Sequence, residues 1–116
     1  MKFLFVLNEG PYGSERAYNA LRLAGSLAKS SDNQLRVFLL GDGAGCAKSG
    51  QKVPEGYYNV ELMLERVLRS DGQIGVCGTC MDARAIAAAE LTQGTHRSSL
   101  DELTQWAMWA DKVLVF

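Results

Sequence analysis

The chain has 116 residues, the usual size of one domain with a single compact core. Hydrophobic residues make up 47% of it and charged residues 22%, which are ordinary globular values and exclude a disordered chain. The net charge of −1 provides no basic patch for nucleic acid or for an anionic membrane, so we expect neither as a partner.

The first nine residues do not predict a targeting segment. Their apolar run stops at the polar pair Asn8-Glu9, whereas a signal peptide needs a longer apolar stretch and a membrane helix needs about 20 apolar residues. The three cysteines, an odd number, favour a reducing compartment over a disulfide framework. We therefore expect a cytoplasmic protein.

The first third of the chain predicts a strand, a helix and a second strand. Residues 3–7 form a continuous apolar run, which is typical of a strand buried on both faces. After a break at residues 10–13, small and apolar residues follow the spacing of one helix face: Ala17, Ala20, Leu21, Ala24, Leu27 and Ala28. A turn at residues 32–33 precedes a second apolar strand at residues 35–40.

The glycine-rich segment 41–45 follows this second strand. A dinucleotide-binding fingerprint would follow the first strand instead, and Ala47 stands where a phosphate-binding loop requires glycine before Lys48. We therefore expect a flexible loop that borders a site, with no nucleotide cofactor.

The next elements are a helix, a strand and another helix. Apolar spacing predicts a long helix over residues 60–68, closed at Asp71-Gly72 with Gly72 as a left-handed cap. Residues 74–77 form a short apolar strand. The alanine-rich segment 81–91 has high helix propensity.

The last part of the chain predicts a helix and a final strand. Ser99 and Glu102 have the spacing of a capping box at the start of the helix. The buried stripe of this helix would comprise Leu100, Leu103, Ala107 and Ala110. Residues 113–116 form the final strand, and Thr95-His96-Arg97 would form a fifth, edge strand with little apolar support.

Strands that alternate with helices imply right-handed crossovers and a parallel sheet covered on both faces. The sequence therefore predicts an α/β fold, a three-layer α/β/α sandwich with a mostly parallel sheet of four to five strands. We expect one domain over residues 1–116, since no linker or internal repeat interrupts the pattern.

Functional sites in such sheets form where loops leave the carboxyl ends of strands, and one of these loops contains the motif Cys77-Gly78-Thr79-Cys80. Cys77 would end a strand and Cys80 would lie near the first turn of a helix, where free amides and the helix dipole stabilise a thiolate. Arg84, one turn beyond Cys80, would add positive charge. The alternative is that both cysteines are small buried hydrophobes.

A zinc site is a weaker alternative for the same motif. Structural zinc sites use four ligands, and only Cys46 and His96, which lie in separate loops, could complete the pair. We expect neither a metal nor an organic cofactor. Cys46 is then a packing residue, and His96 a surface or edge residue rather than a catalytic base.

Two aromatic pairs leave alternatives open. Trp106 and Trp109 lie on one margin of the last predicted helix, where either core packing or a subunit interface would explain them. Tyr57-Tyr58 precedes the second predicted helix, where packing is the default and lining of a pocket is the alternative.

Several motifs, in order along the chain, resemble the YchN-type branch of the DsrE/F-like family. The resemblance covers residues 2–116. Its motifs are Asn8-Glu9-Gly10-Pro11-Tyr12-Gly13-Ser14-Glu15, Gly50-Gln51-Lys52, Glu55-Gly56-Tyr57, the segment from Cys77 to Arg84, Gln105-Trp106 and Ala110-Asp111-Lys112-Val113-Leu114.

The resemblance implies an α/β/α domain that assembles into a homohexamer. Relatives in the wider family pass sulfur as a cysteine persulfide, on a cysteine that Cys77 matches; Cys80 matches a second cysteine of the YchN-type branch. The motif residues that would line the site are Tyr12, Ser14, Gln51, Tyr57 and Arg84. The weakly apolar segment 95–97 departs from the strand usual there in the family.

We therefore expect a small sulfur-handling protein that accepts and relays sulfur as a persulfide on Cys77, with proteins as sulfur donor and acceptor. One alternative is a redox protein in which Cys77 and Cys80 cycle through a disulfide. Thioredoxin-like folds usually place a proline opposite such a motif, and the only prolines here, Pro11 and Pro54, lie in early loops, which weighs against this alternative. Another is a non-catalytic oligomer that binds a small ligand.

Overall fold

Five strands form one sheet in the order β4-β3-β2-β1-β5, and every neighbouring pair is parallel. The structure, a computed structural model, describes all residues from Met1 to Phe116. The strands are β1 (Lys2–Leu7), β2 (Gln34–Leu39), β3 (Gln73–Cys77), β4 (Thr95–Ser98) and β5 (Lys112–Val115). The helices are α1 (Arg16–Leu27), α2 (Val60–Arg69), α3 (Gly78–Ala83) and α4 (Leu100–Trp109), with two 3-10 helices, η1 (Gly41–Ala47) and η2 (Ala88–Glu90).

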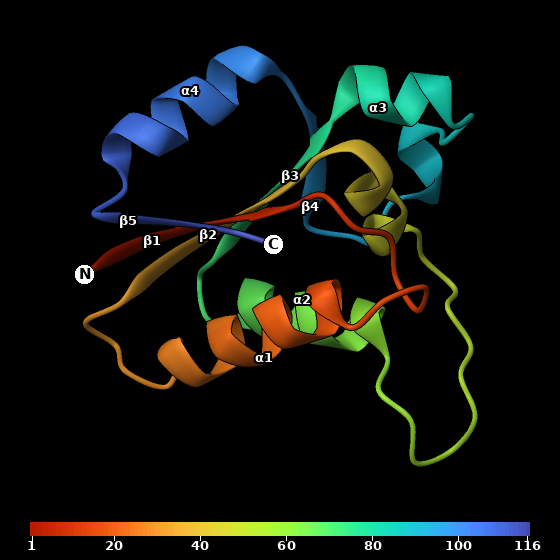
Figure 1. The fold of residues 1–116 in the computed structure, drawn as a ribbon, viewed down its shortest axis with the longest axis horizontal. Helices are drawn as coiled ribbons and strands as arrows, with labels where there is room; N and C mark the ends of the chain where they lie inside the picture. Colours follow the sequence, from red (N-terminus) through yellow and green to blue (C-terminus); the bar gives the residue numbers. More distant parts are fainter.

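Helices cover both faces of this sheet. Figure 1 shows α1 and α2 on one face and α4 on the other, with α3 and η1 at the edge where β2 and β3 end. The predicted three-layer α/β/α sandwich is confirmed. No helix combines the length and the apolar character that crossing a membrane requires.

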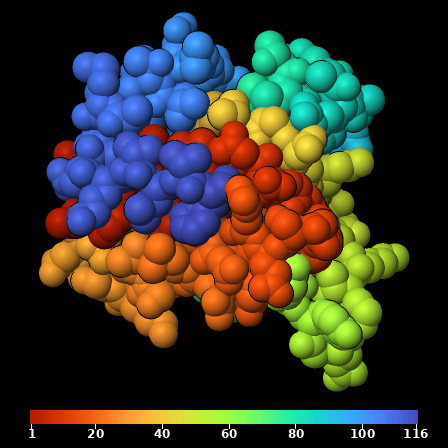
Figure 2. Space-filling model, viewed as in Figure 1, coloured from red at the N-terminus to blue at the C-terminus, as the bar shows by residue number.

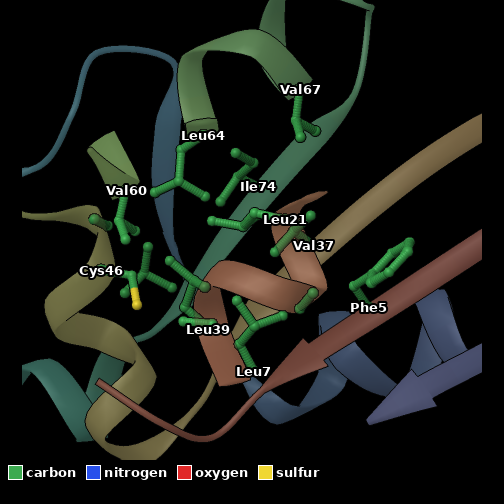
Figure 3. Packing of buried hydrophobic residues seen from close by; sticks show 14 of the residues in the cluster. Phe5, Leu7, Leu21, Val37, Leu39, Cys46, Val60, Leu64, Val67 and Ile74 are labelled. Carbon is green, nitrogen blue, oxygen red and sulfur yellow. The ribbon is translucent and has the colours of Figure 1, made fainter. Parts of the chain in front are cut away.

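The strand β1, which lies between β2 and β5, is buried on both sides because its side chains alternate between two cores. Phe3, Phe5 and Leu7 belong to the larger core, which lies under α1 and α2. Leu4 and Val6 belong to a smaller core under α4. Figure 3 shows the larger core, which includes Phe5 and Leu7 of β1 and Leu21 of α1. The continuous apolar run therefore predicted this strand correctly.

The smaller core corrects the predicted stripe of α4. Trp106 is the buried residue of this helix, 4% exposed, and its ring packs edge-on against Phe38. Leu100, predicted to be buried, is 73% exposed, and Ala107 is exposed as well. The large indole fills the space above the sheet and thus decides which face of the helix turns inward. Trp109 is half-buried, with the Arg36 guanidinium 3.9 Å from its ring centroid.

The glycine-rich segment, expected to be a flexible loop, is the 3-10 helix η1 packed into the protein. Gly43, Ala44, Cys46 and Ala47 are buried in it. A Cβ at Gly43 would lie 2.2 Å from the carbonyl oxygen of Leu7, so glycine is required for this close approach. Small residues gave no apolar signal for burial, which is why the sequence suggested a loop.

Cys46 is fully buried in the larger core, as Figure 3 shows, and its thiol contacts the carbonyl oxygen of Glu9 at 3.5 Å. Burial raises the pKa of this thiol to about 12. Cys46 is therefore an inert packing residue, as expected from the sequence.

The helix predicted over residues 81–91 is shorter and begins earlier. α3 starts at Gly78, directly after the strand, and Ala85, with φ of 54°, lies beyond its end. The high helix propensity of alanine did not show where this helix ends.

At the end of α2 it is Asp71, with φ of 61°, that takes the left-handed conformation expected of Gly72. Gly72 is needed for space instead, because its Cβ would lie 2.6 Å from Cγ1 of Val67.

The fifth strand forms at the edge of the sheet as β4, paired in register with β3 so that Ser98 lies beside Cys77. Hydrogen bonds to α4, rather than apolar packing, hold this strand in place. The Ser98 hydroxyl donates to the Glu102 carboxylate at 2.6 Å, and His96 contacts the same oxygen. Ser99 caps α4 by accepting the Glu102 N–H at 3.3 Å, so one half of the predicted capping box is present.

The surface has two notable features. In Figure 2 the connection between η1 and α2 protrudes from the body of the molecule. The side chains of Met108 on α4 and of Val113 and Val115 on β5 are large, apolar and exposed. The latter two lie on an edge strand of the sheet.

Candidate dithiol site

Cys77 lies at the carboxyl end of β3 and is the N-cap residue of α3. Figure 1 shows this strand leading directly into the helix. Its side chain belongs to the smaller core on the α4 face, and only 8% of the residue is exposed. Cys80, in the first turn of α3, is half-buried. The strand-to-helix turn thus brings together the two cysteines on which the sequence prediction depends.

The two thiols are in direct contact. Their Sγ atoms lie 2.6 Å apart, with Cys80 donating, and both cysteines are free. The backbone N–H of Cys80 also donates to Cys77 Sγ at 3.4 Å, and the Thr79 hydroxyl is 3.5 Å from the same sulfur. Cys80 Sγ in turn accepts the backbone N–H of Gly41 at 3.1 Å. This last contact joins η1 to the site.

These contacts separate the two pKa values. Burial raises the pKa of Cys77, but hydrogen bonds from Cys80 and Thr79 stabilise its thiolate and bring the net pKa below the ordinary value. Burial raises the pKa of Cys80, and the proton it shares with Cys77 raises it further, while the Gly41 N–H and Arg84 act in the opposite direction. Cys77 is therefore the first thiol of the pair to ionise.

A pocket of about 520 Å³ opens beside the thiols. Its walls come from β2, β3, β4 and the first turns of α3 and α4. The lining residues are Phe38, Leu40, Cys77, Gly78, Thr79, Cys80, Arg97, Ser98, Ser99, Leu100 and Leu103. Cys77 is 8% exposed and lines this pocket, so we expect a reactant to approach its sulfur from here.

Arg97 forms the charged wall of the pocket. Its guanidinium makes two hydrogen bonds to the Asp82 carboxylate, at 2.8 and 2.9 Å. A Cβ on Gly78 would lie 2.8 Å from the guanidinium carbon, so the absence of a side chain there lets Arg97 lie close to the start of α3. A thiolate on Cys77 also raises the pKa of Arg97, after the larger effect of Asp82.

Arg84, one of the predicted lining residues, lies beside the motif but outside the pocket. Its guanidinium donates to the Cys80 carbonyl at 3.1 Å and forms an ion pair with Asp42 at 2.8 Å. It therefore fastens α3 to η1 and provides positive charge near Cys80.

Of the other predicted lining residues, Tyr12, Gln51 and Tyr57 lie at the protruding connection, and Ser14 lies just before α1. The Tyr12 hydroxyl bonds to the Gln51 side chain and accepts the Val60 N–H. Tyr57 is 71% exposed, and the Ser14 hydroxyl accepts the N–H of Arg16. Within one chain, none of Tyr12, Ser14, Gln51 and Tyr57 lines the pocket at the thiols.

The sequence prediction missed most of the residues that line the pocket. Ser98 is the last residue of β4 and Ser99 follows it. Parallel strands end at one edge of a sheet, so accepting the weak edge strand would have placed both residues near Cys77. Arg97 had no such signal, since its position depends on the space left by Gly78 and on Asp82.

The two remaining candidate zinc ligands lie away from the pair. Cys46 is in the larger core and His96 contacts Glu102 on the outer edge of the sheet. No group of three or more histidine, cysteine or acidic side chains is arranged to hold a metal ion.

The fold and the site define an α/β/α protein with a cysteine pair at the end of a parallel strand. The DsrE/DsrF-like family matches residues 1–116, and the chain belongs to this family, which confirms the resemblance seen in the sequence. It is 42% identical to Protein YchN of Escherichia coli strain K12 over 116 residues, covering 99% of this chain and 98% of YchN.

The crystal structure of YchN from E. coli is similar to this fold with a TM-score of 0.94 and 42% identity, covering 100% of this chain and 99% of that one. An uncharacterized protein of Methanopyrus kandleri is 32% identical over 111 residues, which cover 96% of this chain and 90% of the relative.

Proposed function

We propose that this protein accepts sulfur on Cys77 as a persulfide and relays it to an acceptor thiol. The observation that carries the proposal is a thiol of lowered pKa at the end of β3 that faces a pocket. Family membership supports it, because relatives in the wider family are associated with sulfur relay.

The transfer requires no metal or organic cofactor. The Cys77 thiolate attacks the outer sulfur of a donor persulfide, R–S–SH, forming a bond between Cys77 Sγ and that sulfur. The bond between the two donor sulfurs breaks, and the donor leaves as the thiolate R–S⁻. An acceptor thiolate then attacks the outer sulfur on Cys77 and returns Cys77 to its thiolate form. Both steps follow the rules of thiol–disulfide exchange, in which the attacking group is a thiolate.

The burial of Cys77 limits the donors that can reach it. With 8% of the residue exposed, a donor sulfur has to enter the pocket beside Arg97 and Leu100. A small persulfide or a cysteine on an extended segment of a protein meets this requirement. A persulfide on a flat protein surface does not.

Intact mass spectrometry tests the proposal. Wild type, Cys77→Ser and Cys80→Ser are incubated with glutathione persulfide, and the gain of one sulfur atom is measured at short times. We expect the gain in wild type and Cys80→Ser but not in Cys77→Ser. Cys46→Ala is the matched control, since it removes a buried thiol of high pKa and leaves the pair intact. Loading that survives in Cys77→Ser and disappears in Cys80→Ser would reverse the assignment.

The contact between the thiols favours a second candidate, a redox protein in which Cys77 and Cys80 cycle between dithiol and disulfide. The same experiment separates the two. If no variant gains sulfur while oxidised wild type loses two hydrogens in mass, the redox candidate is the better account.

A further inference from the structure

The position of Cys80 has a consequence for a persulfide on Cys77. Cys80 Sγ contacts Cys77 Sγ itself, 2.6 Å away. In a loaded Cys77 this atom is the inner sulfur of the persulfide. Cys80 is therefore placed to attack the inner sulfur, and the outer sulfur is then the leaving group.

Loading of Cys77 with sulfur also changes the interactions that set the pKa of Cys80. The thiolate of Cys77 is one reason why the pKa of Cys80 is raised, both through the shared proton and through its charge. Once Cys77 Sγ is bonded to a second sulfur, the charge of the ionised form lies on the outer sulfur, one bond farther along the side chain. The Gly41 N–H, 3.1 Å from Cys80 Sγ, and the nearby Arg84 remain and favour a thiolate on Cys80. Loading of Cys77 thus weakens two of the interactions that raise the pKa of Cys80, both of which involve Cys77 Sγ.

We infer that Cys80 resolves a persulfide on Cys77, so that the cysteine pair reduces persulfide sulfur to hydrosulfide. Cys80 gives its proton to water, and its thiolate forms a bond to Cys77 Sγ. The bond from Cys77 Sγ to the outer sulfur breaks, and that sulfur leaves with the electron pair as HS⁻. The two cysteines lose two electrons in forming a disulfide, and the sulfane sulfur gains them.

This activity rests on the proposed loading of Cys77 and limits the lifetime of the carrier form. An acceptor that enters the pocket receives the sulfur; without an acceptor, Cys80 releases it as hydrosulfide. The pocket of about 520 Å³ leaves room for the departing sulfur. Return to the dithiol requires an external dithiol reductant, which completes a cycle in which the protein acts as a persulfide reductase.

A single-turnover experiment tests the inference. Wild type, Cys80→Ala and the control Cys46→Ala are loaded briefly with glutathione persulfide and desalted, and no reductant is added. Free sulfide and intact mass are then followed together. We expect wild type and Cys46→Ala to release one sulfide per loaded chain and to end as the disulfide. Cys80→Ala should keep its sulfur, with release at least about ten-fold slower because the adjacent nucleophile is gone.

The other outcomes contradict the inference in distinguishable ways. If Cys80→Ala loads and wild type keeps its sulfur, or releases sulfide no faster than Cys80→Ala, only the inference fails. Migration of the sulfur to Cys80 without free sulfide also overturns it, because the outer sulfur would then have been attacked. If folded Cys80→Ala, checked by circular dichroism, gains no sulfur at all, the proposed loading of Cys77 fails as well.

Discussion

The three cysteines of this chain have the same side chain and three different environments. Cys46 is fully buried among apolar side chains, and burial raises its pKa to about 12. Cys77 receives hydrogen bonds that lower its pKa. Cys80 donates one of these hydrogen bonds, and this raises its own pKa. Burial raises the pKa of all three thiols, and only at Cys77 do hydrogen bonds outweigh this effect, so Cys77 should be the most reactive of the three.

Alkylation with iodoacetamide should follow this order. Because the lowered pKa leaves more thiolate on Cys77 near pH 7, Cys77 should react first, and its rate should reach half of its maximum at a lower pH than that of an unperturbed thiol. In Cys80→Ala this midpoint should move to higher pH, since the Cys80 hydrogen bond is lost. Peptide mapping across pH gives the rates. Labelling of Cys46 or Cys80 faster than Cys77 in the folded protein would contradict this prediction.

At the scale of elements, η1 depends on its contact with β1. Gly43→Ala places a Cβ 2.2 Å from the Leu7 carbonyl oxygen, and backbone cannot move aside cheaply. We expect a loss of about 2–3 kcal/mol in the free energy of unfolding, measured with urea. Gly13→Ala is the control, because a Cβ there meets no atom within 4 Å. Equal stability of the two variants would show that η1 is not packed in this way.

The contacts of Ser98 and His96 on β4 with the Glu102 carboxylate on α4 predict that the stability of the fold depends on pH. Burial raises the pKa of Glu102, but the Ser98 hydroxyl and His96 outweigh it and lower the net pKa. A carboxylate with a lowered folded pKa stabilises the fold above its unfolded pKa of about 4.3, and this contribution is lost as the pH falls through the folded pKa.

Glu102→Gln should therefore be less stable than wild type by about 1 kcal/mol at pH 7, a modest value because the side chain is partly exposed. The difference should shrink as the pH falls below about 4. Urea unfolding at several pH values measures it. A difference that stays constant from pH 7 to pH 3 would mean that the ionised carboxylate does not contribute.

The limits of the sequence prediction follow from the same elements. The run of residues 3–7 predicted β1 because a strand buried on both faces has few alternatives. The burial of residues 41–47 and the face of α4 that Trp106 occupies depend on contacts with distant segments, which no local pattern records. At the site, the cysteine pair was predictable from its motif, whereas the pocket depended on the register that places Ser98 beside Cys77.

At the scale of the whole molecule, the chain should assemble with copies of itself. The family resemblance implies a homohexamer, and the exposed apolar side chains of Met108, Val113 and Val115 are the kind that subunit contacts bury. Light scattering coupled to gel filtration should give the mass of six chains. A monomer at micromolar concentration would contradict the assembly.

The central claim is that Cys77 carries the sulfur, and locating that sulfur tests it most directly. Wild type is exposed briefly to glutathione persulfide, alkylated to trap the product and cleaved after Arg69 and Arg84, which releases a peptide containing Cys77 and Cys80 but not Cys46. Fragmentation of this peptide then assigns the additional sulfur to one residue. We predict that it lies on Cys77 at the earliest times. Sulfur found first on Cys80, or on the peptide that contains Cys46, would contradict the account.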